Sequence, residues 1–175
     1  MVIRILVVYD SLTGNVEKMA EMVAEGVRER GGEVDIVKVD EVDLDKIPTY
    51  DGFALGSPTH CGTMSSKMNS FINNRLHKRY WGKLGGKVGV AFTSSGGLGG
   101  GNEITLMALL SVILNFGMIT FGIPDDVSKD VTLHYGAVSI NTPDKDTIEA
   151  CRLLGRRLVE YSMIVKQGLE ATGLG

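Results

Sequence analysis

Short apolar runs alternate along the chain with longer segments in which apolar residues recur at every third or fourth position. The first run, Ile5 to Tyr9, has the length and the branched side chains of a buried parallel strand. From Val16 to Val27, apolar residues recur instead at the spacing of one helix face. Apolar runs predict strands at residues 5–9, 52–56, 87–92 and 118–123, and an alternating pattern predicts one at 33–39.

Helices are predicted between these strands and after the last of them, at residues 16–30, 65–80, 102–116 and 143–165. Thr142 is a plausible cap for the last helix, since Pro143 would then occupy its first position. The acidic segment 40–51 is expected to be a surface loop or a short helix, and 125–135 to be irregular. Strands that alternate with helices predict an open, mostly parallel sheet covered on both faces, in one domain over residues 1–166. Residues 167–175 are expected to form a flexible tail.

Three loops at the carboxyl ends of the first, third and fourth strands share a composition. Residues 10–15, 57–62 and 93–102 contain Gly, Ser and Thr and no Lys or Arg. In sheets of this class a ligand binds beyond the carboxyl ends of the strands. The helix after the first loop would offer unpaired N–H groups and its positive dipole end to a phosphate. Together the loops predict a flat ligand that carries a phosphate. For the first loop alone, an ordinary turn in which Thr13 or Asn15 caps the helix is the alternative.

Composition excludes several classes of function. Charged residues make up 22% of the 175-residue chain and its net charge is −3, so a nucleic-acid partner is not expected. Two cysteines fit neither a disulfide framework nor a metal site, which favours a reducing, cytoplasmic setting. The uncharged stretch 104–124 approaches the length of a membrane span, but Asn115 to Gly117 interrupt it. We therefore expect a buried helix followed by a buried strand there. The amino terminus also lacks the features of a signal peptide.

Motifs for other phosphate-binding or catalytic sites are incomplete. The chain has no Gly-x4-Gly-Lys-Ser/Thr string, and a Gly-x-Gly-x-x-Gly that starts at Gly97 would require a glycine at Asn102. Cys61 is followed after five residues by Lys67, where a phosphatase loop needs an Arg. Cys61 is therefore expected to be a small, partly buried residue in a ligand loop, with a reactive thiol as the alternative. Cys151 lies within the last predicted helix and is expected in the core.

The three histidines are too scattered for a metal site of standard spacing. His60 lies in the loop after the third strand, where a ligand contact and a purely structural place are equally open. His77 is expected to be solvated, and His134 to lie in a surface turn. The basic run 77–79 is a solvated helix end or, alternatively, a contact for the phosphates of a nicotinamide dinucleotide.

These loops resemble those of a known family. Tyr9-Asp-Ser-Leu-Thr-Gly-Asn-Val16 resembles the FMN phosphate loop of flavodoxin-like proteins. Residues 56–66 and 92–103 are similar to the second and third flavin loops of the WrbA-type NAD(P)H:quinone oxidoreductases, and 135–138 is similar to a later segment. The resemblance implies a flavodoxin-like α/β fold, which is a doubly wound, five-stranded parallel sheet of order 2-1-3-4-5 in three αβα layers.

The resemblance also implies the ligands. FMN would be the cofactor, NAD(P)H the co-substrate and a quinone the electron acceptor. The chemistry would take place on the flavin without an essential side-chain acid or base, and His60 is the candidate if one takes part. The implied FMN phosphate contacts are Ser11, Thr13, Gly14, Asn15 and Val16. Pro58, Thr59, His60 and Gly62 would lie along the isoalloxazine, and Thr93, Ser94, Ser95, Gly96 and Gly97 would hold its remaining edge.

The chain departs from the family pattern around the substrate. A longer insertion that helps family members form tetramers is missing, so a homo-oligomer, whether dimer or tetramer, is left open. In the family a His precedes a Gly-Met pair, and Asn115-Phe116 replace it here. The family's Trp near the quinone falls close to Trp81 in this sequence. Thr13 stands where some members have a Tyr. An enzyme and a flavodoxin that carries electrons between protein partners both remain, with a flavin-bearing subunit of a larger assembly as a third role. By family analogy, electron-carrying flavodoxins usually present a strongly acidic face and stack aromatic residues on the flavin, so the mild net charge and the lack of an aromatic in 93–102 favour the enzyme.

Overall fold

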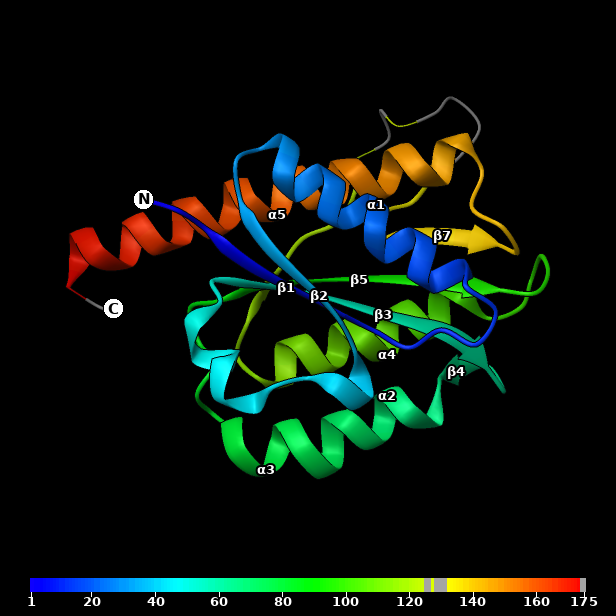
Figure 1. Ribbon diagram of the computed structural model, residues 1–175, viewed down its shortest axis with the longest axis horizontal. Helices are drawn as coiled ribbons and strands as arrows, with labels where there is room; N and C mark the ends of the chain where they lie inside the picture. The colour runs from blue at the N-terminus through cyan, green and yellow to red at the C-terminus, as the bar shows by residue number, and fades with distance from the viewer. Residues whose placement is uncertain (125–126, 128–131, 174–175) are drawn as a thin grey trace.

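The computed structural model describes residues 1–124, 127 and 132–173 and contains a central parallel sheet (Figure 1). Strand β1 (Arg4–Tyr9) lies between β2 (Glu33–Lys38) and β3 (Gly52–His60), and β3 pairs in turn with β5 (Val88–Ser95). These pairs are parallel, so the carboxyl ends of the strands meet at one edge of the sheet. The fold class and the first four places of the predicted strand order are therefore confirmed.

The fifth place in the sheet is shared by two short segments. Strand β6 (Ile119–Thr120) pairs with the start of β5, and β7 (Ala137–Ile140) pairs with its end. The predicted strand over 118–123 was thus too long, and 137–140 was not predicted. After β6 the backbone turns to meet the returning chain, because the Ile123 N–H donates to the carbonyl oxygen of His134 at 3.2 Å. Most of the predicted irregular segment, at 125–126 and 128–131, lies outside the described residues.

Helices cover both faces of the sheet, as Figure 1 shows. Helices α1 (Asn15–Glu29) and α5 (Lys145–Thr172) lie on one face, and α4 (Asn102–Asn115) lies on the other beside residues 66–80. Alternation along β1 supplies both cores, since Ile5 and Val7 face α1 and α5 while Leu6 and Val8 face the opposite layer. The three-layer arrangement is therefore built by the strands that the apolar runs predicted.

The segment over 66–80 is helical throughout, as predicted, but it is not uniform. It consists of α2 (Ser66–Ser70), a π-helical turn η3 (Phe71–Leu76) and α3 (His77–Tyr80), with Ser65 as its N-cap. Two short 3-10 helices, η1 (Val39–Glu41) and η2 (Leu44–Thr49), occupy the acidic segment that was expected to be a loop or short helix. In the described part of the chain, no helix has the length and apolar character needed to cross a membrane.

Two predicted helix caps are wrong. The N-cap of α1 is Gly14, in the left-handed region at φ 87°, and neither Thr13 nor Asn15 caps the helix through its side chain. Helix α5 begins at Lys145 because the Asp144 carboxylate, not Thr142, accepts a hydrogen bond from the Thr147 N–H at 2.8 Å. This helix continues to Thr172, so residues 167–172 are helical. The separation of a domain at 1–166 from a flexible tail stays a prediction.

Replacing Asp144 by alanine is expected to lower the free energy of unfolding by about 1 kcal/mol at pH 7, since the N-cap of α5 is lost. The hydrogen bond from the Thr147 backbone lowers the pKa of Asp144. A carboxyl group with a lowered folded-state pKa stabilises the protein above its unfolded pKa, and this stability disappears as the pH falls through the folded pKa. The difference between the two proteins in the free energy of unfolding by urea should therefore begin to shrink below about pH 4 and vanish below the folded pKa of Asp144. A difference that persists unchanged at pH 2 would contradict the capping role.

Candidate functional site

A hollow of about 170 Å³ lies where the carboxyl ends of β1, β3 and β5 meet. It joins all three loops that the sequence singled out. The residues that line it are Ser11, Leu12, Thr13, Asn15, Val16, Pro58, Thr59, His60, Ser94, Ser95, Gly96 and Asn141. No Lys, Arg, Asp or Glu is among them, so a ligand would meet hydroxyls, amides and backbone groups.

The first wall of the hollow is the loop that leads into α1. Gly14 adopts φ 87°, which a residue with a side chain rarely does, and its N–H donates to the Ser11 hydroxyl at 3.1 Å. Because no side chain caps α1, the N–H groups of its first turn lack the usual partner. Together with the positive end of the helix dipole, they provide neutral donors for an anion.

The acidic residue of this turn is held by groups outside the hollow. Glu17 accepts a hydrogen bond from the Tyr9 hydroxyl at 2.7 Å and forms an ion pair with Lys38 at 3.4 Å. The hydrogen bond from Tyr9 is the main cause of the lowered pKa of Glu17. Burial, followed by this hydrogen bond, raises the pKa of Tyr9. Glu17 therefore remains ionised and paired, and it is not among the residues that line the hollow.

The second wall comes from the end of β3, which runs further than predicted. Residues 57–60 continue the strand, and Thr59 and His60 pair with β4 (Thr63–Met64) in a tight hairpin. Cys61 and Gly62 make the turn, with φ values of 51° and 80°. The turn residues of 57–62 therefore mark the tip of a hairpin and not a loop over their whole length.

A network of hydroxyl groups holds the Thr59 side chain in place. Its Oγ1 lies 2.9 Å from the Thr105 hydroxyl and donates to the Asn102 carboxamide oxygen at 3.2 Å. Thr93, which is fully buried, lies 3.2 Å from the same atom and donates its own proton to the carbonyl of Ser57. The start of α4 and the end of β5 thus position this side of the hollow.

The third wall comes from the end of β5 and from the residue that follows β7. Ser94, Ser95 and Gly96 line the hollow, as does Asn141, which sequence reasoning missed. Residues 137–140 are mostly apolar and could have identified a strand that ends next to Asn141, but the run is short and no strand was predicted there. Leu12 was also missed, because an exposed leucine in a polar loop carries no signal for binding.

Four predicted site residues do not line the hollow. Thr93 lies beneath it, Gly14 is the cap of α1, Gly62 is at the hairpin tip, and Gly97 follows the third wall. The other ten are brought together there, at positions 11, 13, 15, 16, 58, 59, 60, 94, 95 and 96. Their roles toward a cofactor stay predictions.

The other singled-out residues lie outside the hollow. Cys61 is exposed, so the expectation that it is partly buried is wrong, whereas Cys151 is buried in the core as expected, and burial raises the pKa of its thiol. His77 is exposed and its ring lies 4.7 Å from that of Trp81. In residues 1–124, 127 and 132–173, no three His, Cys, Asp or Glu side chains gather as metal ligands would.

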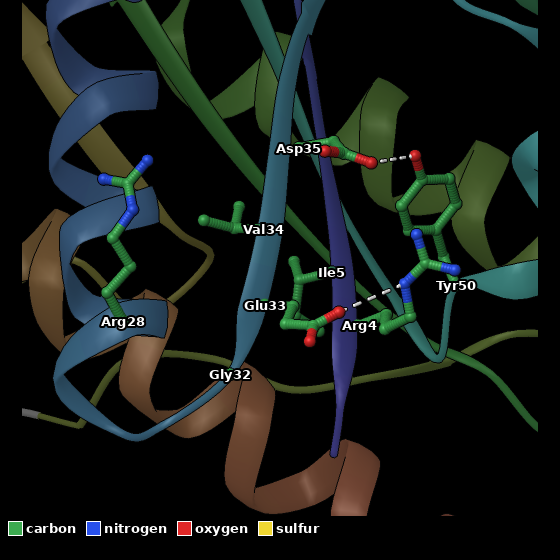
Figure 2. Close-up of a pocket in the computed structure, with 8 residues that line it drawn as sticks. All are labelled: Arg4, Ile5, Arg28, Gly32, Glu33, Val34, Asp35 and Tyr50. Carbon is green, nitrogen blue, oxygen red and sulfur yellow. Dashed lines mark hydrogen bonds and ion pairs between the residues drawn. The ribbon is translucent and has the colours of Figure 1, made fainter.

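A second hollow, of about 350 Å³, lies near the amino-terminal ends of β1 and β2 (Figure 2). Val34 and Arg28 lie on one side of β2, while Tyr50 and Arg4 lie on the other. Three of its charged groups have partners within it, because Arg4 lies 3.5 Å from Glu33 and the Tyr50 hydroxyl donates to Asp35. Charged side chains of this kind protect an edge strand from pairing with another chain. We assign no ligand to this hollow.

Sequence and structure comparisons with known proteins agree on the relatives of this chain. Residues 7–98 match the family model described as Flavodoxin. A protein of Aquifex aeolicus named "Flavodoxin" is 48% identical over 94% of this chain and 90% of its own length. A protein of Archaeoglobus fulgidus named "NAD(P)H dehydrogenase (quinone)" is 36% identical over 91% of this chain and 97% of its own length. The structure of a WrbA-like flavodoxin from Agrobacterium tumefaciens shares the fold, with a TM-score of 0.74 and 23% identity over 91% of this chain and 97% of that one.

Proposed function

Because this chain belongs to the flavodoxin family, we propose that it binds FMN and transfers two electrons from NAD(P)H to a quinone-type acceptor. The observation that carries the proposal is the hollow of neutral donors shared by three strand ends. The quinone part of the proposal draws on relatives such as the one from Archaeoglobus fulgidus. That this chain is a flavodoxin-like electron-transfer protein follows from its family alone.

The size of the hollow suggests which part of FMN it would take. Pockets that enclose a ligand of drug size are typically about 300–1,000 Å³, and this hollow has about 170 Å³. It therefore suits the phosphate and the adjoining part of the ribityl chain. Ser11, Thr13 and Asn15, with the open N–H groups of α1, would bind the phosphate without a cation.

The isoalloxazine would then extend along the rims formed by residues 58–62 and 94–97. Thr59 is held in place by Thr105 and Asn102, so this rim is preorganised before any ligand binds. When bound, FMN supplies the hydride acceptance and the electron transfer, while the chain supplies binding and orientation. His60 is the one titratable side chain among the residues that line the hollow, so proton transfer by the protein at this place would fall to it.

An electron carrier is the second candidate, because the Aquifex aeolicus relative is named "Flavodoxin". Leu12 and Leu98, which are 80% and 92% exposed, give the rim an apolar surface that a protein partner could cover. A cytoplasmic location, a homo-oligomeric state and the lack of a nucleic-acid partner stay proposals that rest on composition and family.

Titration of the apo-protein with FMN, followed by steady-state oxidation of NADH and NADPH with a benzoquinone, tests the function. We expect one FMN per chain and turnover with at least one of the two donors. FMN binding without turnover would support the carrier. A protein that does not bind FMN would refute both candidates.

A further inference from the structure

Asn141 adopts a backbone conformation that most residues avoid. Its φ is 58°, in the left-handed region that Gly, Asn and Asp tolerate best. Three hydrogen bonds hold it there. Its N–H donates to the Ser95 carbonyl at 2.7 Å, and its own carbonyl accepts from the Ser139 and Ser94 hydroxyls at 2.8 and 3.3 Å. The backbone is thus fixed to the end of β5, where the third wall of the hollow begins.

The side chain of Asn141 is free to meet a ligand. The residue is exposed and lines the hollow together with Ser11, Thr13 and Asn15 of the first loop. Its carboxamide makes no hydrogen bond with another residue in the described ranges 1–124, 127 and 132–173. Non-glycine residues in left-handed conformations often occur at functional sites, where the surrounding structure enforces them.

We propose that Asn141 is a phosphate-binding residue of this site, donating its carboxamide N–H to the terminal phosphate of FMN. The proposal rests on the proposed function. Since no Lys or Arg lines the hollow, each neutral donor contributes strongly to binding of an anion. A carboxamide offers two such donors, and it lines the same hollow as the start of α1, whose N–H groups are also open. The residue therefore favours phosphorylated flavin over riboflavin.

The test is the isosteric variant Asn141→Asp, because aspartate also tolerates the left-handed conformation. It replaces two N–H donors by a carboxylate that repels a phosphate dianion. We expect the dissociation constant for FMN, measured by quenching of flavin fluorescence, to rise about a hundredfold. The dissociation constant for riboflavin, which has no phosphate, should stay within about twofold of the wild-type value. The melting temperature of the apo-protein should not change.

Two further variants distinguish a loss of the side-chain contact with the phosphate from a change in the backbone conformation. Asn141→Gly removes the donors without adding charge or strain, and should weaken FMN binding about tenfold. Thr142→Ala, at the exposed neighbour outside the hollow, should leave FMN binding unchanged. An unaltered FMN affinity in both Asn141 variants, or an equal loss for FMN and riboflavin, would overturn the phosphate contact. A wild-type protein without affinity for FMN would refute the proposed function instead.

Discussion

Replacing Thr13 by glutamate is expected to raise the dissociation constant for FMN by about a thousandfold. Thr13 lines the hollow beside the open amino terminus of α1, where no side chain supplies a cation. A carboxylate there would stand about 4 Å from the phosphate, and two unit charges at that distance near a protein surface repel with about 4 kcal/mol. Flavin absorbance retained after gel filtration of the reconstituted protein measures the loss.

Thr13→Gln is the matched control for this variant, because its side chain has the same length and no charge. It should retain most of the flavin, so that the loss in Thr13→Glu can be assigned to charge and not to size. Full flavin absorbance in Thr13→Glu would show that the phosphate binds elsewhere.

Replacing Gly155 by alanine is expected to lower the free energy of unfolding by about 2 kcal/mol, although alanine favours a helix by about 1 kcal/mol over glycine. A Cβ at this position of α5 would overlap the carbonyl oxygen of Val23 and lie 2.9 Å from the Val27 nitrogen. Gly26 approaches α5 in the same way, at the carbonyl of Arg152. Because these atoms belong to the helix backbone, helices α1 and α5 must move apart, and the proposed phosphate-binding loop leads directly into α1.

Gly168→Ala provides the control within the same helix. Nothing lies within 4 Å of its ideal Cβ and the residue is exposed, so helix propensity alone should decide the outcome. We expect it to stabilise the protein by about 0.5–1 kcal/mol. Thermal unfolding of both variants checks the pair, with the melting temperature of Gly155→Ala lower by roughly 4–8 °C. Equal effects of both substitutions would contradict the close packing of α1 and α5.

The positions of the central strands could be predicted from the sequence because they are largely apolar runs, as at residues 5–9 and 87–92, whereas their order in the sheet was implied by the resemblance to flavodoxin-like proteins. The fifth strand could not be predicted, since β6 has two residues and β7 follows a segment without periodicity. The N-caps of α1 and α5 could not be predicted either. Other residues that can cap a helix lie close to Gly14 and Asp144 in the sequence, and only the backbone conformation decides which residue becomes the cap.

Most of the predicted site residues meet at the hollow because parallel strands bring their carboxyl ends to one edge. Thr93 shows the limit of this reasoning. Ser94 lines the hollow, whereas the neighbouring Thr93 side chain lies beneath it and contacts Ser57 and Thr59. Asn141 shows another limit, because its place depends on a pairing between β5 and β7 that spans more than forty residues of sequence. No local pattern reports such a contact.

The central claim is that this protein accepts electrons from a nicotinamide through bound FMN. Its most direct test is anaerobic mixing of the FMN-loaded protein with NADH and, separately, with NADPH, while the flavin absorbance is followed. We expect rapid bleaching with at least one of them and recovery when a benzoquinone is added. Bleaching by dithionite but by neither nicotinamide would contradict the oxidoreductase and identify an electron carrier.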